Sequence, residues 1–455
     1  MASPTSAGEQ AERDRAGLLD LLRLARQAQG LDPDVPFPDD AAPGEAACVS
    51  PFSVMVKPVG SHCNLRCSYC YYLPTPQLGP PRMSDETLET FVRQYIAASQ
   101  GPAVSFVWHG GEPTLAGLDF YRRVVQLQQQ YLPDGWECWN NLQTNGVLLD
   151  DEWCEFLSQN HFDVGLSIDG TPEIHDQYRP NPQGTGSYQA AADAIARLQA
   201  HGVQPDLLCT VTSTTAREAL SVYRRLRDFG TGWIQFIPIV REDESGQLTA
   251  DSVSGQAYGD FLVTVFDEWV LHDLGRLNVQ FFAETMRVLA GGQAGLCWMA
   301  PTCGRALIVE ADGGVYSCDH FVTQSHRLGD VMGDDLGRLA DSPAQLAFGE
   351  AKQTGLPPEC LACPWLELCN GGCPKDRLWG GLNVLCAGLS RFFAHAVPKL
   401  TQIIAMTRAG GTPSAIMDEL RTKAVTAWQG VGRNDPCLCG SGRKAKQCCW
   451  DRRPK

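Results

Sequence analysis

Short runs of apolar and β-branched residues alternate along the chain with longer stretches in which apolar residues recur every three or four positions. The short runs predict strands at residues 53–59, 103–109, 137–144, 164–168, 207–212 and 234–240. The longer stretches predict helices at residues 85–99, 118–130, 151–159, 187–200, 216–229 and 256–271. Strands in alternation with helices favour a parallel sheet, so we expect an α/β fold, either a barrel or an open doubly wound sheet. In both folds the reactive residues lie where the strands end.

Two less regular stretches flank this pattern. Residues 16–29 space their leucines as an amphipathic helix does, and a linker rich in Pro and Asp follows to residue 50. Residues 400–428 are typical of a helix and hinge. No stretch approaches the roughly eighteen apolar residues that cross a bilayer, and the N-terminus lacks the apolar core of a signal peptide. We therefore expect no transmembrane segment and no membrane partner.

Composition and charge narrow the class of protein further. Of the 455 residues, 44 % are apolar and 20 % are charged, which excludes disordered and collagen-like chains. The 37 Lys and Arg against 52 Asp and Glu give a net charge of −15, so we expect no nucleic-acid partner. The 19 cysteines, an odd number without a secretory signal, argue against a disulfide framework. They favour metal-bound thiolates in a reducing compartment, and we expect a cytoplasmic protein.

A triad of cysteines follows the first predicted strand. Cys63, Cys67 and Cys70 form a C-x3-C-x2-C array in one loop. Three thiolates this close together can hold three irons of a 4Fe-4S cluster and leave the fourth iron open for chemistry. A structural zinc site fits less well, because it takes four ligands and no further cysteine lies nearby. Three free cysteines in one loop are the remaining alternative.

The triad and two neighbouring features resemble the radical S-adenosylmethionine superfamily. Tyr69 stands before the third cysteine, and Gly110, Gly111 and Glu112 open a GGEP motif after the second predicted strand. The resemblance implies a partial barrel of six βα units that binds S-adenosylmethionine at the open iron. It implies that Tyr69 stacks on the adenine. The glycines would let the backbone approach the ligand, and Glu112 would answer its ammonium group.

Two polar residues at later strand ends complete the expected cofactor contacts. Ser167 in SIDG and Arg179 in HDQYR resemble stretches of this superfamily that contact the ribose, the carboxylate of the ligand or the substrate. A polar residue at a strand end can instead cap a helix. We expect Ser167 and Arg179 to contact the cofactor.

Eight further cysteines lie between residues 297 and 386, which is two complete sets of four. Their order, C-x5-C-x14-C, then C-x2-C-x5-C-x3-C and a last cysteine, resembles the SPASM extension of some radical S-adenosylmethionine enzymes. By that resemblance, one auxiliary 4Fe-4S cluster is held by Cys297, Cys303, Cys318 and Cys373. The other is held by Cys360, Cys363, Cys369 and Cys386. Two zinc sites remain an alternative, because four thiolates also complete a zinc site.

Asp319 follows directly after one of these cysteines, in VYSCDHF. A carboxylate beside a cluster ligand is a candidate general base for a substrate that loses a proton as an electron leaves. It can also be a turn residue that accepts a backbone hydrogen bond. With both cysteine fields and the GGEP motif, this aspartate resembles the anaerobic sulfatase-maturating enzymes. These oxidise a cysteine or serine of an unfolded sulfatase to Cα-formylglycine, and the resemblance covers roughly residues 54–397.

The resemblance implies that Asp319 is the catalytic base and that the substrate is an unfolded sulfatase polypeptide. It also implies three 4Fe-4S clusters, S-adenosylmethionine, and a flavodoxin- or ferredoxin-type electron donor. Peptide-crosslinking maturases share both cysteine fields, so a maturase that forms thioether or carbon crosslinks is the alternative. A non-enzymatic electron carrier or zinc scaffold is a third hypothesis.

The last residues form a separate small motif. Its cysteines, in a C-x-C-x8-C-C array, are Cys437, Cys439, Cys448 and Cys449. Four thiolates in so short a stretch suit one tetrahedral zinc, and the array resembles the SEC-C motif. The predicted domains are an N-terminal helix and linker (1–50), a radical S-adenosylmethionine domain (51–285), a SPASM domain (286–398), a helical linker (399–430) and the SEC-C motif (431–455).

Overall fold

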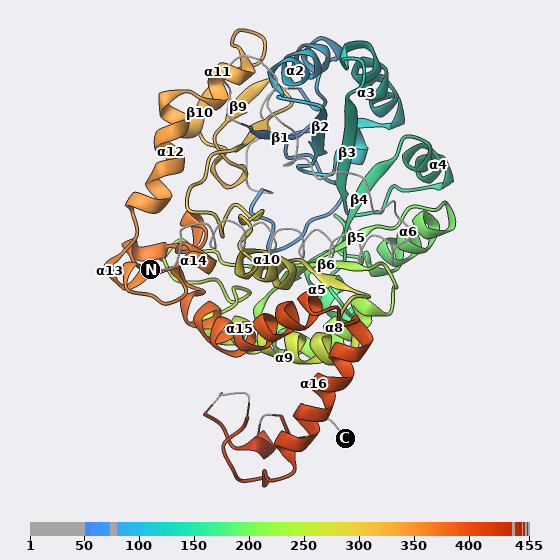
Figure 1. Cartoon of the computed structure of the whole chain (residues 1–455). Helices are drawn as coiled ribbons and strands as arrows, with labels where there is room; N and C mark the ends of the chain where they lie inside the picture. Colours follow the sequence, from blue (N-terminus) through green and yellow to red (C-terminus); the bar gives the residue numbers. More distant parts are fainter. Residues whose placement is uncertain (1–50, 73–79, 439–441, 448, 451–452, 454–455) are drawn as a thin grey trace. The chain divides into compact units, whose positions relative to one another are not determined.

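The computed structural model describes residues 51–72, 80–438, 442–447, 449–450 and 453 (Figure 1). These residues divide into two compact units. The first, here called the sheet unit, contains residues 51–209 and 301–356. The second, the helical unit, contains residues 210–300 and the described residues from 357 onward. The predicted helix at 16–29 and its linker lie outside the described residues.

Eight strands of the sheet unit lie in the order β10-β9-β8-β1-β2-β3-β4-β5. Their bounds are β1 (Ser53–Val56), β2 (Ala103–Trp108), β3 (Glu137–Thr144), β4 (Phe162–Ser167), β5 (Asp206–Val211), β8 (Ala306–Val309), β9 (Gly314–Tyr316) and β10 (Arg327–Asp330). Strands β1 to β5 pair in parallel with their neighbours, and β8 pairs in parallel with the free edge of β1. Strands β9 and β10 add as an antiparallel meander. The predicted parallel α/β architecture is therefore confirmed.

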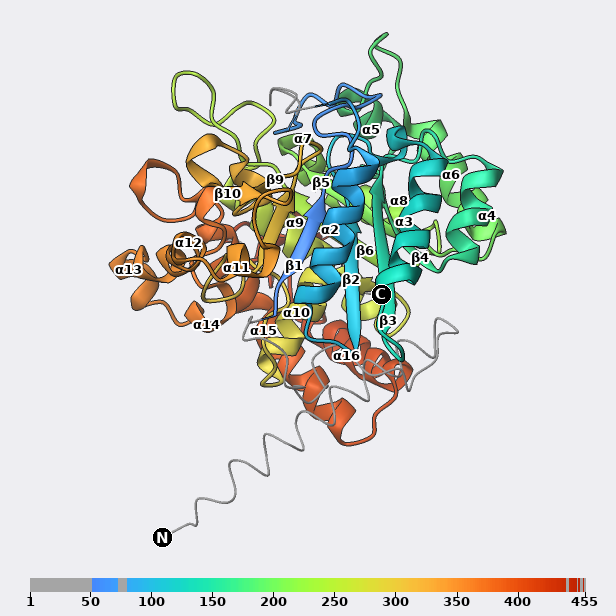
Figure 2. The ribbon, with the colours of Figure 1, turned by 90° about the horizontal axis from the view of Figure 1, so that it is seen from above.

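Helices connect these strands and cover one side of them. They are α2 (Asp85–Ala98), η2 (Pro113–Ala116), α3 (Leu118–Tyr131), α4 (Asp151–Gln159), α5 (Pro172–Tyr178), α6 (Tyr188–Ala200), η3 (Asp319–Phe321), η4 (Gln324–His326), α11 (Leu336–Ala340) and α12 (Pro343–Thr354). Figures 1 and 2 show α2, α3, α4 and α6 outside strands β1 to β4. Each crossover therefore returns the chain to the same end of the next parallel strand.

Local sequence explains where these elements begin and which face they bury. The Ser84 hydroxyl accepts a hydrogen bond from the Thr87 amide at 3.0 Å and so caps α2, whose first turn is acidic. In β2, Val104, Phe106 and Trp108 alternate with more exposed residues and are almost fully buried. Strand β1 ends earlier than predicted, at Val56, two residues before a proline that cannot donate a ladder hydrogen bond.

The helical unit is built mainly from packed helices. Its elements are α7 (Ser213–Arg217), α8 (Ala219–Arg227), β6 (Trp233–Pro238), α9 (Gly255–His272), β7 (Asn278–Val279), α10 (Gln280–Leu289), α13 (Pro358–Leu361), α14 (Leu366–Cys369), η5 (Pro374–Asp376), η6 (Leu378–Gly380), α15 (Cys386–Arg408), α16 (Pro413–Trp428) and η7 (Ala445–Gln447). The predicted helix at 216–229 is two helices, because Glu218 leaves the helical conformation between them (φ −107°, ψ 28°). None of the described helices is long and apolar enough to span a membrane.

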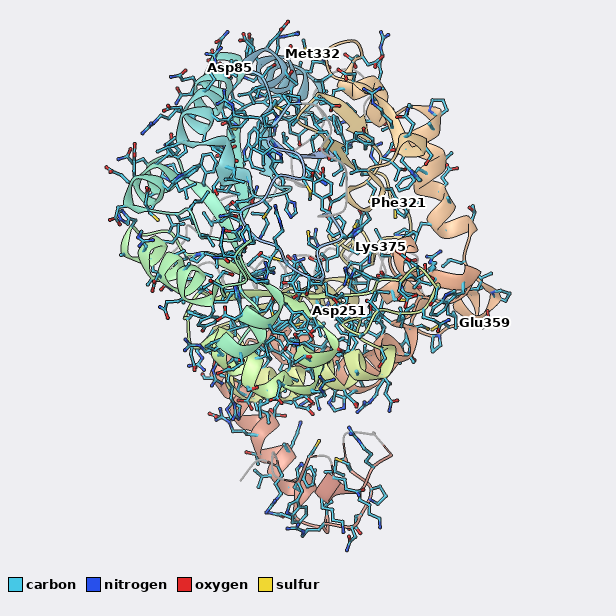
Figure 3. All side chains as sticks on the ribbon, turned by 180° about the vertical axis from the view of Figure 1, so that it is seen from behind. Asp85, Asp251, Phe321, Met332, Glu359 and Lys375 are labelled. Carbon is cyan, nitrogen blue, oxygen red and sulfur yellow. The ribbon has the colours of Figure 1, made fainter. Side chains whose placement is uncertain are left out.

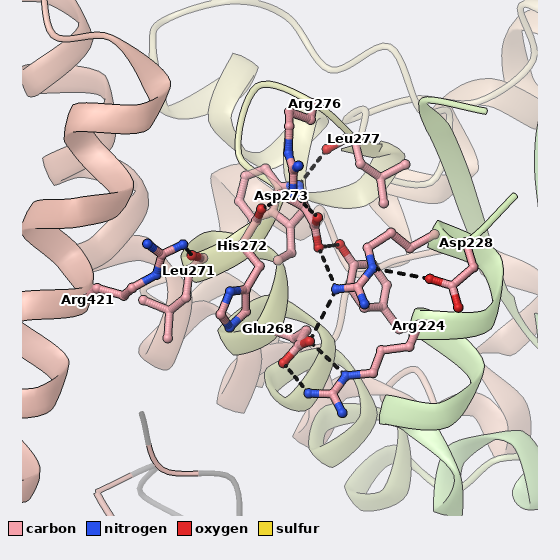
Figure 4. A network of polar contacts seen from close by, with 12 residues as sticks. Arg224, Asp228, Glu268, Leu271, His272, Asp273, Arg276, Leu277 and Arg421 are labelled. Atoms are coloured by element: carbon pink, nitrogen blue, oxygen red, sulfur yellow. Dashed lines mark hydrogen bonds and ion pairs between the residues drawn. The ribbon is translucent and has the colours of Figure 1, made fainter. Parts of the chain in front are cut away.

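A polar network connects α8, α9 and α16 in the helical unit (Figure 4). Asp273, which is 2 % exposed, accepts hydrogen bonds from Tyr223 at 2.8 Å and from Arg276 at 2.9 Å. Arg227 also lies 3.4 Å from this carboxylate. Arg421 of α16 donates to the backbone carbonyl of Leu271 at 2.6 Å. The buried carboxylate is thus compensated by several donors, which a buried charge requires.

Candidate active site

The loop that follows β1 carries the first three predicted ligands. The hollow that it encloses is lined by Ser61, Cys63, Leu65, Cys67, Cys70, Tyr72 and Gly111. Burial raises the pKa of Cys63 to about 12 and the pKa of Cys67 to about 11, and the neighbouring sulfurs add to both shifts. Three half-buried sulfurs that repel one another as anions need cations to stay deprotonated. This donor set therefore fits a cluster whose irons bind three thiolates and leave one iron open.

The cysteine loop is fastened to the end of α5. The backbone amide of Arg66 donates to the Pro180 carbonyl at 2.7 Å, and that of Ser68 donates to the Tyr178 carbonyl at 2.9 Å. These two bonds hold the loop on either side of Cys67. A fixed loop keeps the three sulfurs at one spacing, which a rigid inorganic cluster requires.

Two of the predicted cofactor contacts meet at Asp169. The Tyr69 hydroxyl donates to this carboxylate, and Arg179 Nε donates to it at 2.8 Å. The Arg179 guanidinium also lies over the Tyr69 ring, 5.4 Å from its centre. Burial alone would raise the pKa of Asp169, but Arg179 outweighs it and holds that pKa below its ordinary value. The roles of Tyr69 and Arg179 toward the cofactor remain predictions, and Asp169 fixes both side chains.

Ser167 lies at the end of β4 and pairs with a side chain from the end of β3. Its hydroxyl accepts a hydrogen bond from Gln143 Nε2 at 3.1 Å. Gly165 makes room for this pair, because a Cβ there would lie 2.1 Å from Gln143 Oε1. The predicted contact of Ser167 with the cofactor remains a prediction.

The two glycines after β2 are required by the close approach of other segments. A Cβ on Gly111 would lie 2.0 Å from the His62 carbonyl oxygen of the cysteine loop, and φ is +47° there. A Cβ on Gly110 would lie 2.4 Å from Cγ of Lys57. The sequence predicted that glycine is needed at these positions because the backbone approaches a ligand. In the structure glycine is needed because Lys57 and the cysteine loop lie too close for a side chain.

Glu112 is a buried hub at the same strand ends. Its carboxylate accepts hydrogen bonds from the Thr114 amide and hydroxyl, the Thr144 hydroxyl and the Asn145 amide, at 2.6–3.1 Å. Burial raises the pKa of Glu112, and these four donors oppose that rise. The carboxylate therefore ties the end of β2 to the end of β3. Its predicted contact with a ligand ammonium remains a prediction.

Asp319 begins η3, just after β9, and η3 ends at Phe321, which is labelled in Figure 3. Its Oδ1 lies 2.7 Å from Nζ of Lys57, and its Oδ2 accepts a hydrogen bond from the Tyr71 hydroxyl. Burial would raise the pKa of Asp319, but chiefly the charge of Lys57, and then that of His109, holds it well below its ordinary value. The carboxylate is therefore ionised at neutral pH, as a general base must be.

Sequence reasoning missed Lys57 and Tyr71. Tyr71 is one of two tyrosines directly after the third cysteine, and Lys57 is the residue after β1. A lysine directly before a proline at a strand end is a weak signal, because most lysines are solvated.

The second cysteine field divides between the two units. In the helical unit, Cys360, Cys363 and Cys386 all raise the pKa of Cys369, after burial. These four thiols are therefore neighbours, as the predicted second auxiliary cluster requires. The predicted ligation itself remains untested.

The other predicted set of four has members in both units. In the helical unit, burial raises the pKa of Cys373 to about 12, and Cys297 adds to that shift. In the sheet unit, Gln345 Nε2 donates to the carbonyls of Gly304 and Ser317, at 2.6 and 3.2 Å. This amide ties together the residues next to Cys303 and Cys318. Ligation by these four cysteines remains a prediction.

The C-terminal motif packs on α9 of the helical unit. Cys437 is buried against Val263, with Trp428 and Cys449 beside them, and Cys439 and Cys448 lie outside the described residues. Among the residues that the structure does describe, no group of three or more His, Cys, Asp or Glu is arranged to hold a single metal ion.

Comparison with known proteins follows the same three parts. The chain matches the radical SAM superfamily over residues 58–223, the iron-sulfur cluster-binding domain SPASM over residues 286–364, and the SEC-C motif over residues 433–451. Fold and site thus define a radical S-adenosylmethionine enzyme with a SPASM domain, a class that uses 4Fe-4S clusters and S-adenosylmethionine.

Individual relatives narrow the class. The serine-type anaerobic sulfatase-maturating enzyme of Bacteroides thetaiotaomicron is 40 % identical, over 83 % of this chain and 97 % of its own. The cysteine-type enzyme of Clostridium perfringens strain 13 is 34 % identical, over 78 % of this chain and 98 % of its own. A solved structure, native anSMEcpe with bound AdoMet and Cp18Cys peptide, is 32 % identical with a TM-score of 0.72, over 78 % of this chain and 99 % of its own. The chain belongs to the family of anaerobic sulfatase-maturating enzymes.

Proposed function

We propose that this enzyme oxidises a cysteine or serine side chain of an unfolded sulfatase polypeptide to Cα-formylglycine. The observation that carries the proposal is the carboxylate of Asp319, which lies 2.7 Å from the Lys57 ammonium in the same unit as the Cys63, Cys67 and Cys70 hollow. When bound, S-adenosylmethionine beside a reduced cluster supplies a 5′-deoxyadenosyl radical that removes hydrogen from carbon. Asp319 accepts the thiol or hydroxyl proton of the target residue.

Other residues of the sheet unit bind and orient the reactants in this proposal. Tyr69 and Arg179 contact the cofactor, and Asp169 holds them in place. The backbone at Gly110 and Gly111 approaches the cofactor closely in this proposal, and Ser167 adds a polar contact. The hollow of the cysteine loop is lined mainly by apolar surface, which supports the exclusion of water.

Electron flow requires further groups. We propose three 4Fe-4S clusters, of which the nearer auxiliary cluster would take the electron that leaves the substrate. A flavodoxin- or ferredoxin-type protein in the cytoplasm is the proposed donor for the first. We also propose one zinc ion on the C-terminal cysteines, of which the two described members, Cys437 and Cys449, pack in one cluster.

A direct test uses two sulfatase-derived peptides, one with Cys-x-Pro-x-Arg and one with serine at the first position. Anaerobic incubation with reconstituted enzyme, dithionite and S-adenosylmethionine is followed by mass spectrometry. Formylglycine from cysteine lowers the peptide mass by about 18 Da and from serine by about 2 Da, and both products react with a hydrazine. A loss of about 2 Da without hydrazine reactivity indicates a crosslink instead, and contradicts the proposal.

The base assignment has its own test. Asp319→Asn keeps the shape of the side chain but cannot take the proton, so formylglycine formation falls about 100-fold or more while 5′-deoxyadenosine still forms. Asp341→Asn is the matched control, because it removes a carboxylate that lies 2.9 Å from Arg305 in the same unit. Equal formylglycine yields from both variants would remove Asp319 from the mechanism.

A further inference from the structure

Lys57 is a fully buried cation placed between two carboxylates. Its side chain is 0 % exposed, and Nζ lies 2.7 Å from Asp319 Oδ1 and 3.8 Å from Glu310 Oε1. The ammonium nitrogen lies over the Tyr72 ring, 3.5 Å from its centre. Lysine is rarely buried unless it is paired, so this arrangement has a specific cause.

The two tyrosines after Cys70 complete the arrangement. The Tyr71 hydroxyl donates to Asp319, and the Tyr72 hydroxyl donates to Glu310. The loop that carries the first cysteine triad is thereby joined to the residues that follow β8 and β9. Lys57 lies at the centre of this junction, where its charge offsets both carboxylates.

The glycine after His109 belongs to the same arrangement. A Cβ on Gly110 would lie 2.4, 2.6 and 2.7 Å from Cγ, Cδ and Cβ of Lys57. The methylene chain of Lys57 therefore needs glycine at this position to reach Asp319. This requirement does not depend on any ligand, so the position of the Lys57 side chain is set by the packing of the chain itself.

The contacts of the two oxygens explain what the lysine does for Asp319. One oxygen faces the ammonium and the other faces the Tyr71 hydroxyl, so the carboxylate plane is held by two partners from two segments. The Asp319 side chain is still 20 % exposed, whereas Lys57 and Glu310 are sealed. Of the two carboxylates beside Lys57, Asp319 is thus the one that a substrate can reach.

We propose that Lys57 is a positioning residue that holds the Asp319 carboxylate in the orientation for proton transfer from the target side chain. This inference rests on the proposed function, in which Asp319 is the base. Lys57 touches neither substrate nor cofactor in this proposal and acts only through Asp319. Correct orientation of a catalytic group contributes strongly to rate, and a small misplacement is costly.

The test replaces Lys57 by Met, which keeps the length of the stem and removes the charge. We expect 5′-deoxyadenosine formation within about threefold of the parent, whereas formylglycine per 5′-deoxyadenosine falls about 10- to 100-fold. The KM for the peptide and its Kd, measured by fluorescence anisotropy, stay unchanged, because the lysine does not contact the substrate. Lys57→Arg keeps a cation, so we expect it to restore part of the formylglycine formed per 5′-deoxyadenosine.

The matched control is Arg227→Met in the helical unit. Arg227 is likewise a cation beside a buried carboxylate, 3.4 Å from Asp273. Its loss lowers the thermal midpoint but leaves the ratio of formylglycine to 5′-deoxyadenosine unchanged. The ratio therefore separates misorientation of the base from general destabilisation.

The outcomes are distinguishable from failure of the proposed function. If the parent enzyme makes no formylglycine, the proposed function is wrong. If the parent makes formylglycine and Lys57→Met has the same ratio of formylglycine to 5′-deoxyadenosine as the parent, only the positioning role is wrong. A Lys57→Met variant that loses 5′-deoxyadenosine formation in equal measure also overturns the role, because the lysine then serves the fold of the cysteine loop.

Discussion

At the scale of single residues, the buried carboxylate of Asp169 in the sheet unit is paired with several partners. The Asp169 carboxylate accepts hydrogen bonds from Tyr69 and Arg179, and the Asp169 backbone amide donates to Nδ1 of His175 at 3.2 Å. The other ring nitrogen of His175 faces the Ser187 hydroxyl at 3.0 Å. A buried polar network of this kind is stable only when every member is satisfied. Protonation of His175 at Nδ1 would therefore remove the hydrogen bond that this nitrogen accepts from Asp169.

This network predicts a pH dependence of stability. Burial, and then the charge of Arg179, lowers the pKa of His175 from 6.5 to about 4 in the folded chain. In the unfolded chain His175 binds a proton near pH 6.5, whereas in the folded chain it binds this proton only near pH 4. The free energy of unfolding therefore falls by about 3 kcal/mol as the pH drops through this window, and none of this loss is present above it. Thermal unfolding midpoints from pH 7 to pH 4 measure the slope.

Two variants assign this slope to His175. In His175→Asn, which does not titrate, the midpoint is lower at pH 7 and depends less on pH between 6.5 and 4. His201→Asn removes a partly exposed histidine, 3.2 Å from Asp151, and keeps the parental slope. An unchanged slope in His175→Asn would show that other groups cause the acid sensitivity.

At the scale of elements, α9 and α15 approach each other through glycines. The Cβ of a residue at 388 in α15 would lie 2.0 Å from the Gly255 carbonyl oxygen and 2.7 Å from the Gly259 amide nitrogen, both in α9. Helix backbones reach such contact only where neither carries a side chain. Helix α15 also begins at Cys386, so its distance from α9 sets the position of one predicted cluster ligand.

Gly388→Ala tests this contact, because the sign of the change in the free energy of unfolding distinguishes helix propensity from a backbone clash. Helix propensity alone would make alanine more stable by about 1 kcal/mol. The backbone clash outweighs that gain, so we expect a net loss of about 2 kcal/mol or more and a lower iron content. Thermal unfolding and iron analysis measure both effects.

The matched change is Gly430→Ala, where an added Cβ meets nothing within 4 Å. That variant keeps the parental midpoint or raises it slightly. A stabilised Gly388→Ala would mean that the two helices separate without cost.

At the scale of the whole molecule, the C-terminal motif is an addition to the catalytic units. It contacts α9 through Cys437 and Val263, and Arg443 lies 3.2 Å from Asp260. No described residue of the motif belongs to the predicted catalytic or cofactor-binding set. The SEC-C match at residues 433–451 is also separate from the two larger family matches.

Truncation after Gly430 therefore removes the motif without removing the reaction. We expect the shortened enzyme to lose about one equivalent of zinc. We expect the ratio of formylglycine to 5′-deoxyadenosine to match that of the full chain. Metal analysis by plasma mass spectrometry and the peptide assay measure the two quantities. A coupling ratio that drops on truncation would show that the motif takes part in substrate handling.

The sequence alone predicted the elements whose signal is local. Helix α9 (Gly255–His272) was predicted within one residue at each end, because its apolar periodicity is long and it starts after a serine cap. The helix at 216–229 was predicted as one piece, because the break at Glu218 is a backbone conformation that apolar spacing does not encode. Strand β8 was not predicted, because its partner β1 lies some 250 residues away in the chain.

What the amino-acid sequence determined by itself was the chemistry of the family: the cysteine spacings, the GGEP motif and Asp319, each readable within a few residues. Only the tertiary structure decided that Lys57, Tyr71 and Asp319 form one cluster and that Gly110 makes room for a lysine. The physical reason is range. Ligand spacing and periodicity are properties of neighbouring residues, whereas a buried charge is compensated by whichever distant segments the fold brings to it.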